Sequence, residues 1–367
     1  MSEMILWGGI FLVSLIILIV ALTFMVNKVR RLGFVRKLSK DKKGPSIAIA
    51  IGFLVALIVI GAVVTTMLNS LIIVLHLLVF WLLGDLVALI IRKKSKAPFY
   101  IACGLTVIYM SIAAYLCFTV VEKDYKLDTT KDVGSIRVVQ FADSHLGTTF
   151  DGEGLNKYVE QINATNPDVV LITGDFVDDG TSREDMIKGC EALGKLDTTY
   201  GVYFSFGNHD KGYSDASARG FSGDDLVQEL EKNGVIVLED EAVLIDNRFY
   251  VVGRQDRSEE SRGNTRAETD ELLKDLDTTK YIIVMDHQPN DYDNQAKSSA
   301  DLVLSGHTHG GQLIPVNDVG IWIGANDATY GLESRNNTDF IVTSGISDWE
   351  ILFKTGCRSE FVVIDVE

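Results

Sequence analysis

Five of the six histidines of this 367-residue chain lie in short polar motifs, beside Asp, Asn and Gly residues. Imidazole is the commonest metal ligand near neutral pH, and carboxylate and amide oxygens complete mixed nitrogen–oxygen sites. These residue types therefore predict a metal centre rather than packing contacts. The motifs, in chain order, are Asp143-Ser144-His145, Gly174-Asp175-Phe176-Val177-Asp178, Gly207-Asn208-His209-Asp210, His287 and Gly306-His307-Thr308-His309-Gly310.

The motifs supply seven candidate ligands with nitrogen and oxygen donors and no thiolate. Such a set suits Mn, Fe, Zn, Co or Ni better than Ca, Mg or Cu(I). Seven ligands are too many for one tetrahedral ion, and they suit two divalent ions that share Asp175. A pair of ions activates water for attack on phosphorus and holds the phosphoryl group, so the predicted chemistry is phosphoester hydrolysis. The candidate ligands are Asp143, His145, Asp175, Asn208, His287, His307 and His309.

His209 follows a candidate ligand directly and is assigned a different role. A histidine beside the metals can protonate a leaving alkoxide. Asp178, three residues after Asp175, is the candidate carboxylate that orients His209. A single Asp-x-His or His-x-His pair is structural in most sequences. Five motifs in order, each after an apolar run, favour the catalytic interpretation.

Apolar runs before the motifs predict the strands that must position them. In open α/β sheets, ligand sites form outside the carboxyl ends of strands. Predicted helices alternate with the early strands, and further strands follow residue 234, which indicates an α/β domain with a second, mixed sheet packed on the first. Strands are expected at residues 136–141, 169–173, 202–206, 235–238, 242–245, 249–252, 281–285, 302–305, 340–344 and 361–366, and helices at 155–164, 183–196, 224–233 and 265–276.

The ordered motifs resemble the calcineurin-like metallophosphoesterase superfamily over about residues 136–366. The sequence GHTHGGQ at 306–312, with Tyr330-Gly331-Leu332 and Thr343-Ser344-Gly345, is similar to the bacterial membrane-anchored branch of that superfamily. The resemblance implies a two-sheet α/β/β/α sandwich and a binuclear centre. It also implies that His209 is the catalytic acid and Asp178 its orienting carboxylate. By similarity, the first metal takes Asp143, His145, Asp175 and His309, and the second takes Asp175, Asn208, His287 and His307.

The expected activity is hydrolysis of phosphodiester, pyrophosphate or phosphomonoester bonds by a metal-activated hydroxide. The alternative is a membrane sensor that uses the metal domain to bind rather than to cleave. A sensor predicts loss of one or more catalytic residues, and every position of the pattern is filled in this chain. The enzyme interpretation is therefore favoured.

Four apolar stretches fill the first third of the chain, at about residues 4–26, 46–68, 70–91 and 98–121. Each exceeds the roughly 20 residues that a helix needs to cross a bilayer. The first has no basic segment before it and is too long for a typical cleaved signal. The predicted domains are a transmembrane domain at 1–121, a linker at 122–134 and a metallophosphoesterase domain at 135–367.

Basic residues between the apolar stretches predict their orientation. The loop at residues 27–45 carries eight Lys or Arg, and the loop at 92–97 carries four. With four spans, both loops lie on one side, which the positive-inside rule places in the cytoplasm. The domain after residue 121 is then expected outside the cytoplasm, anchored in the cell membrane. Three spans would reverse this placement.

The charge of the two parts constrains their partners. Residues 1–121 contain 12 Lys/Arg and 3 Asp/Glu, whereas the rest contains 22 and 47. So acidic a domain is a poor generic binder of nucleic acid, because phosphate neutralisation needs basic patches. The expected partners are the lipid bilayer and a phosphoester substrate. A lipid-linked substrate is favoured because membrane tethering raises its local concentration.

Ionisable groups outside the motifs leave alternatives open. His76 and Asp85 lie in the third apolar stretch, where structural contacts between helices are favoured over a transport or sensing role. Arg254, Arg257 and Arg262 either contact a second anionic group of the substrate or serve surface solubility.

Overall fold

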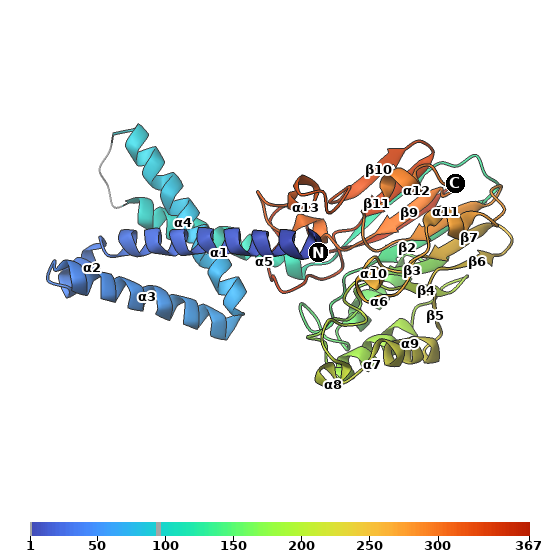
Figure 1. Cartoon of the computed structure of the whole chain (residues 1–367), viewed down its shortest axis with the longest axis horizontal. Coiled ribbons are helices and arrows are strands. Elements are labelled where there is room, and N and C mark those ends of the chain that lie inside the picture. The colour runs from blue at the N-terminus through green and yellow to red at the C-terminus, as the bar shows by residue number, and fades with distance from the viewer. Residues whose placement is uncertain (1, 93–96) are drawn as a thin grey trace. The chain divides into compact units, whose positions relative to one another are not determined.

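The computed structural model describes residues 2–92 and 97–367 of the chain. The chain divides into two compact units, Met1–Ile112 and Ala113–Glu367 (Figure 1). Three of the four basic residues of the predicted loop at 92–97 fall at 93–96, outside the described residues. The two units are described separately below.

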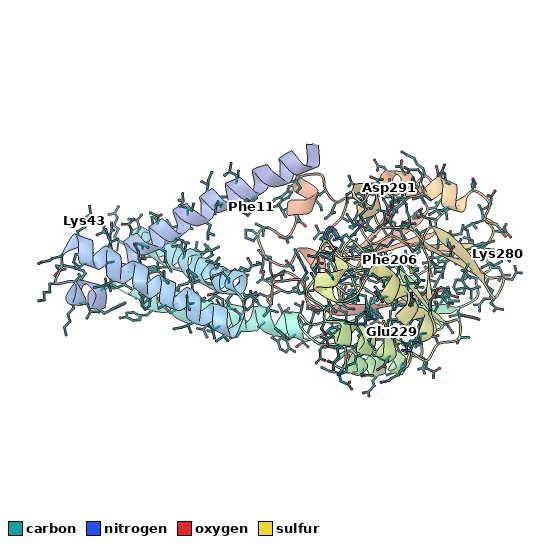
Figure 2. The ribbon with its side chains drawn as sticks, turned by 60° about the horizontal axis from the view of Figure 1, so that its bottom comes forward. Phe11, Lys43, Phe206, Glu229, Lys280 and Asp291 are labelled. Carbon is teal, nitrogen blue, oxygen red and sulfur yellow. The ribbon has the colours of Figure 1, made fainter. Side chains whose placement is uncertain are left out.

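The first unit consists of apolar helices. Four segments are long and apolar enough to cross a membrane: Phe11–Val29, Lys43–Val64, Met67–Ile90 and Ala97–Phe118. The four predicted spans are thus confirmed as helices, although the last ends at Phe118 rather than at residue 121. Most of their large apolar side chains are exposed, as at Phe11 (Figure 2), which is typical of surfaces that face lipid. The helices are α1 (Ser2–Val29), α2 (Gly33–Leu38), α3 (Lys43–Val64), α4 (Met67–Ile90) and α5 (Ala97–Phe118). The last residues of α5, from Ala113 on, belong to the second unit.

Polar groups within these helices make structural contacts, as the sequence predicts. Asp85 of α4 forms an ion pair with Lys28 of α1. The Nδ1 atom of His76 lies 2.8 Å from the carbonyl oxygen of Ile72, and its ring packs against Tyr109 with centroids 5.5 Å apart. A charged group within apolar helices is stabilised by such pairing.

The second unit contains two six-stranded sheets. The strand order is β1-β12-β2-β3-β4-β5 in the first sheet and β10-β11-β9-β8-β7-β6 in the second. The first sheet comprises β1 (Val121–Leu127), β2 (Ile136–Phe141), β3 (Val169–Thr173), β4 (Val202–Ser205), β5 (Val235–Val237) and β12 (Glu360–Val366). The second comprises β6 (Glu241–Ile245), β7 (Phe249–Gly253), β8 (Tyr281–Met285), β9 (Leu302–Ser305), β10 (Gly331–Arg335) and β11 (Thr338–Val342).

The two sheets pack face to face between helices. In β2, Ile136 and Val138 belong to an apolar core shared by both sheets, whereas Val139 and Phe141 belong to a core with helices. This period of two is what a strand buried on both faces requires. The predicted α/β/β/α sandwich is therefore confirmed. The helices over the first sheet are α6 (Leu155–Ala164), α7 (Arg183–Leu193) and α9 (Gly223–Lys232), and those over the second are α11 (Thr269–Leu273) and α12 (Tyr292–Gln295).

Parallel pairing brings the polar motifs to one edge of the sandwich. Strands β2, β3 and β4 run parallel in the first sheet, and β7, β8, β9 and β11 run parallel in the second. The carboxyl ends of parallel strands meet at the same edge of a sheet. The loops that follow these strands carry all five motifs.

The structure differs from the expected linker at its beginning. Val121–Leu127 forms the edge strand β1, which pairs in parallel with β12. Exposed charged residues alternate with half-buried residues along β1, and one of the half-buried residues, Lys123, is itself charged. The segment is therefore polar in composition and still fits the edge of a sheet. The division of the chain at residues 121 and 135 stays a prediction.

Candidate metal centre

The strand-end loops hold their polar residues in an uncommon backbone conformation. The φ angles are 57° at Asp143, 37° at His145, 52° at Asp175, 71° at His307 and 50° at His309. Residues other than glycine rarely adopt this left-handed region, and such strain tends to cluster at functional sites. Five of the seven predicted ligands share this feature.

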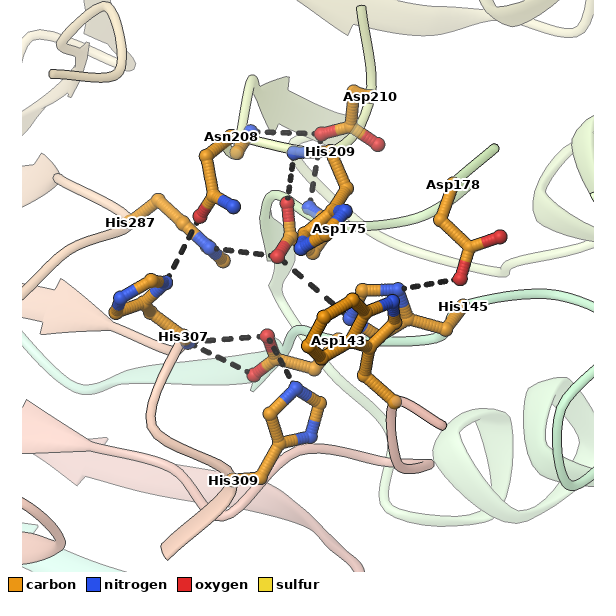
Figure 3. A network of polar contacts seen from close by, with 12 residues as sticks. Asp143, His145, Asp175, Asp178, Asn208, His209, Asp210, His287, His307 and His309 are labelled. Carbon is orange, nitrogen blue, oxygen red and sulfur yellow. Dashed lines mark hydrogen bonds and ion pairs between the residues drawn. The ribbon is translucent and has the colours of Figure 1, made fainter. Parts of the chain in front are cut away.

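The first group of candidate ligands comprises Asp143, His145 and His309. One donor atom from each lies within 4.8 Å of the others, and all three residues are buried. The rings of His145 and His309 stack with centroids 5.2 Å apart. The Nε2 atom of His309 lies 3.8 Å from Oδ1 of Asp143 (Figure 3). These three side chains come from loops in both sheets.

The second group comprises Asp175, His287 and His307, whose donor atoms also lie within 4.8 Å of one another. Asn208 joins this group, because its Oδ1 lies 2.9 Å from Nδ1 of His307. The Oδ2 atom of Asp175 lies 3.1 Å from Nε2 of His287 and 3.6 Å from Nε2 of His145. Asp175 therefore lies between the two groups, as Figure 3 shows.

In His145 and His287, Nδ1 of the ring makes a hydrogen bond, which leaves Nε2 available as a metal ligand. His145 directs Nδ1 to Asp178 at 3.1 Å, and His287 directs Nδ1 to the carbonyl oxygen of Thr173 at 2.7 Å. The Nε2 atoms of both rings are buried, and among the described residues their nearest polar neighbour is Oδ2 of Asp175, itself a candidate ligand. An N–H that donates outward fixes the tautomer in which the other nitrogen can bind a metal.

The charges of the site also fit divalent cations. Burial raises the pKa of Asp143 to about 6. Burial also opposes ionisation of Asp175, but the neighbouring His287 holds the pKa of that carboxyl well below its usual value. A buried carboxylate needs a positive partner, and bound cations supply one. These two groups of side chains are suited to hold two divalent ions.

Asp178 has a different partner from the one expected. The sequence predicts a pair of Asp178 with His209, whereas Oδ2 of Asp178 lies 3.1 Å from Nδ1 of His145. The cause lies in the backbone, because the amides of His145 and Leu146 donate to the carbonyls of Asp175 and Phe176. This pairing of adjacent loops brings residue 145 beside residue 178.

His209 is held by its backbone and by aromatic neighbours. Its amide donates to Oδ1 of Asp175 at 2.8 Å. Its ring lies between Tyr213 and Trp349, with centroid distances of 5.1 Å and 4.9 Å, and 5.1 Å from the ring of His145. Burial lowers the pKa of His209. Sequence reasoning did not predict the two aromatic neighbours, and no motif marks Trp349.

Asp210 fixes the backbone of two motifs and was given no role by sequence reasoning. Its carboxylate accepts hydrogen bonds from the amides of Asp175 (2.8 Å), Phe176 (2.8 Å), Val177 (3.1 Å) and Gly207 (2.7 Å). The side chain is fully buried. Burial and then repulsion from Asp175 raise the pKa of Asp210 to about 7, although the amides oppose the rise. The one signal for Asp210 in the sequence is its position as the last residue of the Gly-Asn-His-Asp motif.

Asp348 is a further buried carboxylate that the sequence did not reveal. Its Oδ1 lies 3.3 Å from Nδ1 of His309. It also accepts hydrogen bonds from the side chain of Gln312 and from the amide of Trp349. Burial raises the pKa of Asp348 to about 6. The Gln at the end of GHTHGGQ therefore supports the carboxylate behind His309.

The arginines near residue 254 belong to the framework. Arg254 is buried and pairs with Asp286 at 3.0 Å and Asp291 at 2.6 Å. Arg262 donates to the carbonyls of Gly212 (2.8 Å) and Asn208 (3.1 Å), which supports the loop of a candidate ligand. Arg254 is thus a buried residue bound to carboxylates rather than a surface residue.

Comparisons with known proteins identify the family. Residues 136–311 match the model of the calcineurin-like phosphoesterases. An uncharacterized metallophosphoesterase of Aquifex aeolicus is 34% identical over 200 residues, which cover 53% of this chain and 72% of that protein. The chain belongs to the calcineurin-like metallophosphoesterase family.

Two further relatives and one solved structure are also similar to this chain. An uncharacterized metallophosphoesterase of Campylobacter jejuni is 29% identical over 63% of this chain and 59% of its own length. A transmembrane protein with metallophosphoesterase domain from Danio rerio is 30% identical, over 64% of this chain and 54% of its own. The chain thus spans a little over half of each of these two relatives. A dimetal phosphatase structure from Danio rerio aligns with a TM-score of 0.36 and 14% identity, over 57% of this chain and 87% of its own.

Substitution of Asp178 tests the orientation of His145. Asp178→Ala removes the acceptor that fixes the imidazole, so we expect the affinity for one of two divalent ions to fall about 10- to 100-fold. Asp178→Asn keeps an acceptor oxygen and should lose less. Calorimetric titration of the metal-free full chain with Mn²⁺ or Zn²⁺ measures both. Asp179→Ala is the control, because Asp179 accepts from the amides of Tyr213 and Ser214; equal losses would contradict this role of Asp178.

Substitution of Asp210 tests the fixation of the loops. Asp210→Asn turns an amide group toward backbone donors, so we expect the free energy of unfolding to fall by about 3 kcal/mol or more. Thermal unfolding of the detergent-solubilised full chain in chelator measures the change without bound metal. Asp225→Asn, at a partly exposed carboxylate that accepts from the amide of Ser222, should cost only about 1 kcal/mol. A Tm shift no larger than in this control would refute the assigned role.

Proposed function

We propose that the chain is a membrane-anchored hydrolase of phosphoric ester bonds that works with two divalent metal ions. The observation that carries this proposal is the position of Asp175, whose Oδ2 lies 3.6 Å from Nε2 of His145 and 3.1 Å from Nε2 of His287. A carboxylate between two ligand groups is suited to bridge two ions. Mn, Fe, Zn, Co and Ni all fit the donors. The proposed ligands are Asp143, His145, Asp175 and His309 for one ion, and Asp175, Asn208, His287 and His307 for the other.

The chain's own residues would position the reaction. When bound, two divalent ions lower the pKa of a water molecule and offset charge on a phosphoryl group. Asn208 presents its carbonyl oxygen to the second group while its amide donates to the hydroxyl of Tyr213 at 2.9 Å. His209 lies beside the first group and is our candidate for the acid that delivers a proton to the leaving oxygen. Asp178 acts indirectly, by holding the tautomer of His145.

The bond that is cleaved is proposed as a phosphodiester, a pyrophosphate or a phosphomonoester, with a lipid-linked substrate favoured. The apolar helices support the lipid-linked choice, because tethering to a bilayer raises the local concentration of such substrates. The relatives named transmembrane proteins with a metallophosphoesterase domain combine the same two parts.

We further propose that the catalytic unit faces away from the cytoplasm at the cell membrane. The described loop at residues 30–42, between α1 and α3, is rich in Lys and Arg, and positive loops remain in the cytoplasm. Four spans then place the segment after α5 on the opposite side. The competing function, a sensor that binds without cleaving, shares this topology and differs only in turnover.

Leaving-group dependence tests the role of His209. His209→Ala should lower kcat about 10²- to 10⁴-fold for an alkyl phosphodiester, whose leaving oxygen needs a proton. The loss should be much smaller for a p-nitrophenyl ester, whose leaving group is stable as an anion. Turnover by the full chain loaded with Mn²⁺, with metal content measured in parallel, gives both values.

Two results would count against this function. Equal losses for the two esters would remove His209 as the acid. A wild-type chain that binds two metals but cleaves neither ester would favour the sensor.

Reporter fusions test the orientation. A reporter enzyme that folds only outside the cytoplasm should be active when fused after Glu367 and inactive when inserted in the loop at residues 30–42. The expected pattern follows from the basic residues of that loop and an even number of spans. A reporter that works only in the cytoplasm gives the matched control, with the opposite pattern. Activity of the cytoplasmic reporter at Glu367 would overturn the outward placement.

A further inference from the structure

An exposed apolar segment follows the His307–His309 motif directly. Residues 312–323 read QLIPVNDVGIWI and contain one charged residue, Asp318. This segment includes the short helix α13 (Val319–Trp322). Five of its seven large apolar side chains are exposed: Ile314 by 49%, Val316 by 50%, Val319 by 46%, Ile321 by 41% and Trp322 by 66%. The other two, Leu313 and Ile323, are half-buried. Clustered exposed apolar groups of this kind usually mark a contact with a partner or a membrane.

Hydrogen bonds connect this segment to the end of helix α5. The amide of Ile314 donates to Oγ1 of Thr355 at 2.7 Å, and the amide of Thr355 donates to the carbonyl of Gln312 at 2.8 Å. Lys354, the residue directly before Thr355, donates its amide to the carbonyl of Ala113 in α5 at 3.0 Å. The segment and the last turns of α5 are thus separated by one loop.

The same loop caps α5 a second time. The amide of Ser359 donates to the carbonyl of Leu116 at 3.0 Å, and its hydroxyl donates to the carbonyl of Cys117 at 2.7 Å. The last carbonyls of a helix have no partner within the helix, so these bonds fix the loop to the helix end. Because α5 is long and apolar enough to span a bilayer up to Phe118, this end lies where a span would leave the membrane.

We propose that residues 312–323 form a membrane-contact surface that rests in the headgroup region of the bilayer beside the end of α5. The occupant is the lipid of the membrane that α5 crosses, because the surface is continuous with the point where the helix emerges. A tryptophan among aliphatic residues with few charges is the composition that favours this interfacial depth.

The surface also borders the candidate metal centre. Gln312, its first residue, donates to Asp348, which lies 3.3 Å from Nδ1 of His309. Trp349, the residue directly after Asp348, packs against the ring of His209. The candidate metal centre therefore adjoins the proposed membrane-contact surface, which makes a phosphate ester in the headgroup of a membrane lipid its substrate class. This second part rests on the proposed function, whereas the contact itself does not.

Fluorescence quenching tests the contact without metal or turnover. The full chain carrying Trp7→Phe, Trp81→Phe and Trp349→Phe keeps Trp322 alone, and is placed in nanodiscs of phosphatidylcholine and phosphatidylglycerol. Lipids brominated near the start of the acyl chain should quench its emission by at least about twofold relative to plain lipids, because interfacial side chains reach about 5–10 Å into the headgroup and acyl boundary.

A second position supplies the matched control. Ile236→Trp, with all four natural tryptophans replaced by Phe, places the probe on β5, at the opposite edge of the first sheet from β1, which follows α5. Its emission should respond to iodide and not to brominated lipid. If Trp322 behaves like this control, the contact is refuted. Shielding of Trp322 from both quenchers would mean that a second copy or another part of the chain covers it, which also refutes the proposal.

Substrate preference tests the second part. Val316→Ser with Trp322→Ser should lower kcat/KM about 10-fold for a long-chain lipid phosphate ester in nanodiscs and leave the value for a soluble p-nitrophenyl ester unchanged. Equal effects on both substrates would overturn the headgroup assignment. Lipid quenching of Trp322 without any hydrolysis by the wild-type chain would refute the proposed function alone.

Discussion

The candidate metal centre depends on one constraint. Negative charge is buried at the edge where the motif loops of the two sheets meet. Asp143, Asp175, Asp178, Asp210 and Asp348 are almost fully buried there. A buried carboxylate is costly unless each oxygen finds a donor or a cation. Asp210 accepts hydrogen bonds from four backbone amides, yet burial raises its pKa to about 7, and burial raises the pKa of Asp143 and of Asp348 to about 6. Amides and imidazoles alone therefore leave the edge short of positive charge, which is the condition that divalent cations relieve.

Close approach of the backbone makes this concentration of charge possible. A Cβ atom on Gly306 would lie 2.7 Å from Oδ2 of Asp143, and one on Gly345 would lie 2.8 Å from Cβ of the same residue. Both distances are too short for a side chain, so the loops after β9 and β11 reach the loop after β2 only through glycine. The amide of His307 then donates to both carboxylate oxygens of Asp143, at 3.0 Å and 3.1 Å. One carboxylate thus connects the two sheets at the site.

The sequence predicts the strands and the positions of the candidate ligands because both are local features. An apolar run that ends in Asp, Asn or His is visible without any tertiary information, as at Asp175 after β3. Partners across loops are not visible in this way. Asp178 meets His145 because two loops pair through their backbones, and Asp348 meets His309 from 39 positions away in the chain. Strands β1 and β10 were not predicted from the sequence. Both are polar or largely exposed rather than apolar runs, and each is recognised only by its pairing, β1 with β12 and β10 with β11.

The stretch from Thr343 to Glu360 links the proposed anchor to the proposed chemistry. At one end, Gly345 packs against Asp143, and its carbonyl accepts the amide of Glu360 at 2.9 Å. Directly before Glu360, Ser359 binds the last carbonyls of α5. Only two short hydrogen-bonded steps therefore separate the end of a candidate membrane helix from a candidate metal ligand. These bonds involve Leu116 and Cys117, which belong to the second unit. The last turn of the helix thus acts as part of the framework of the site.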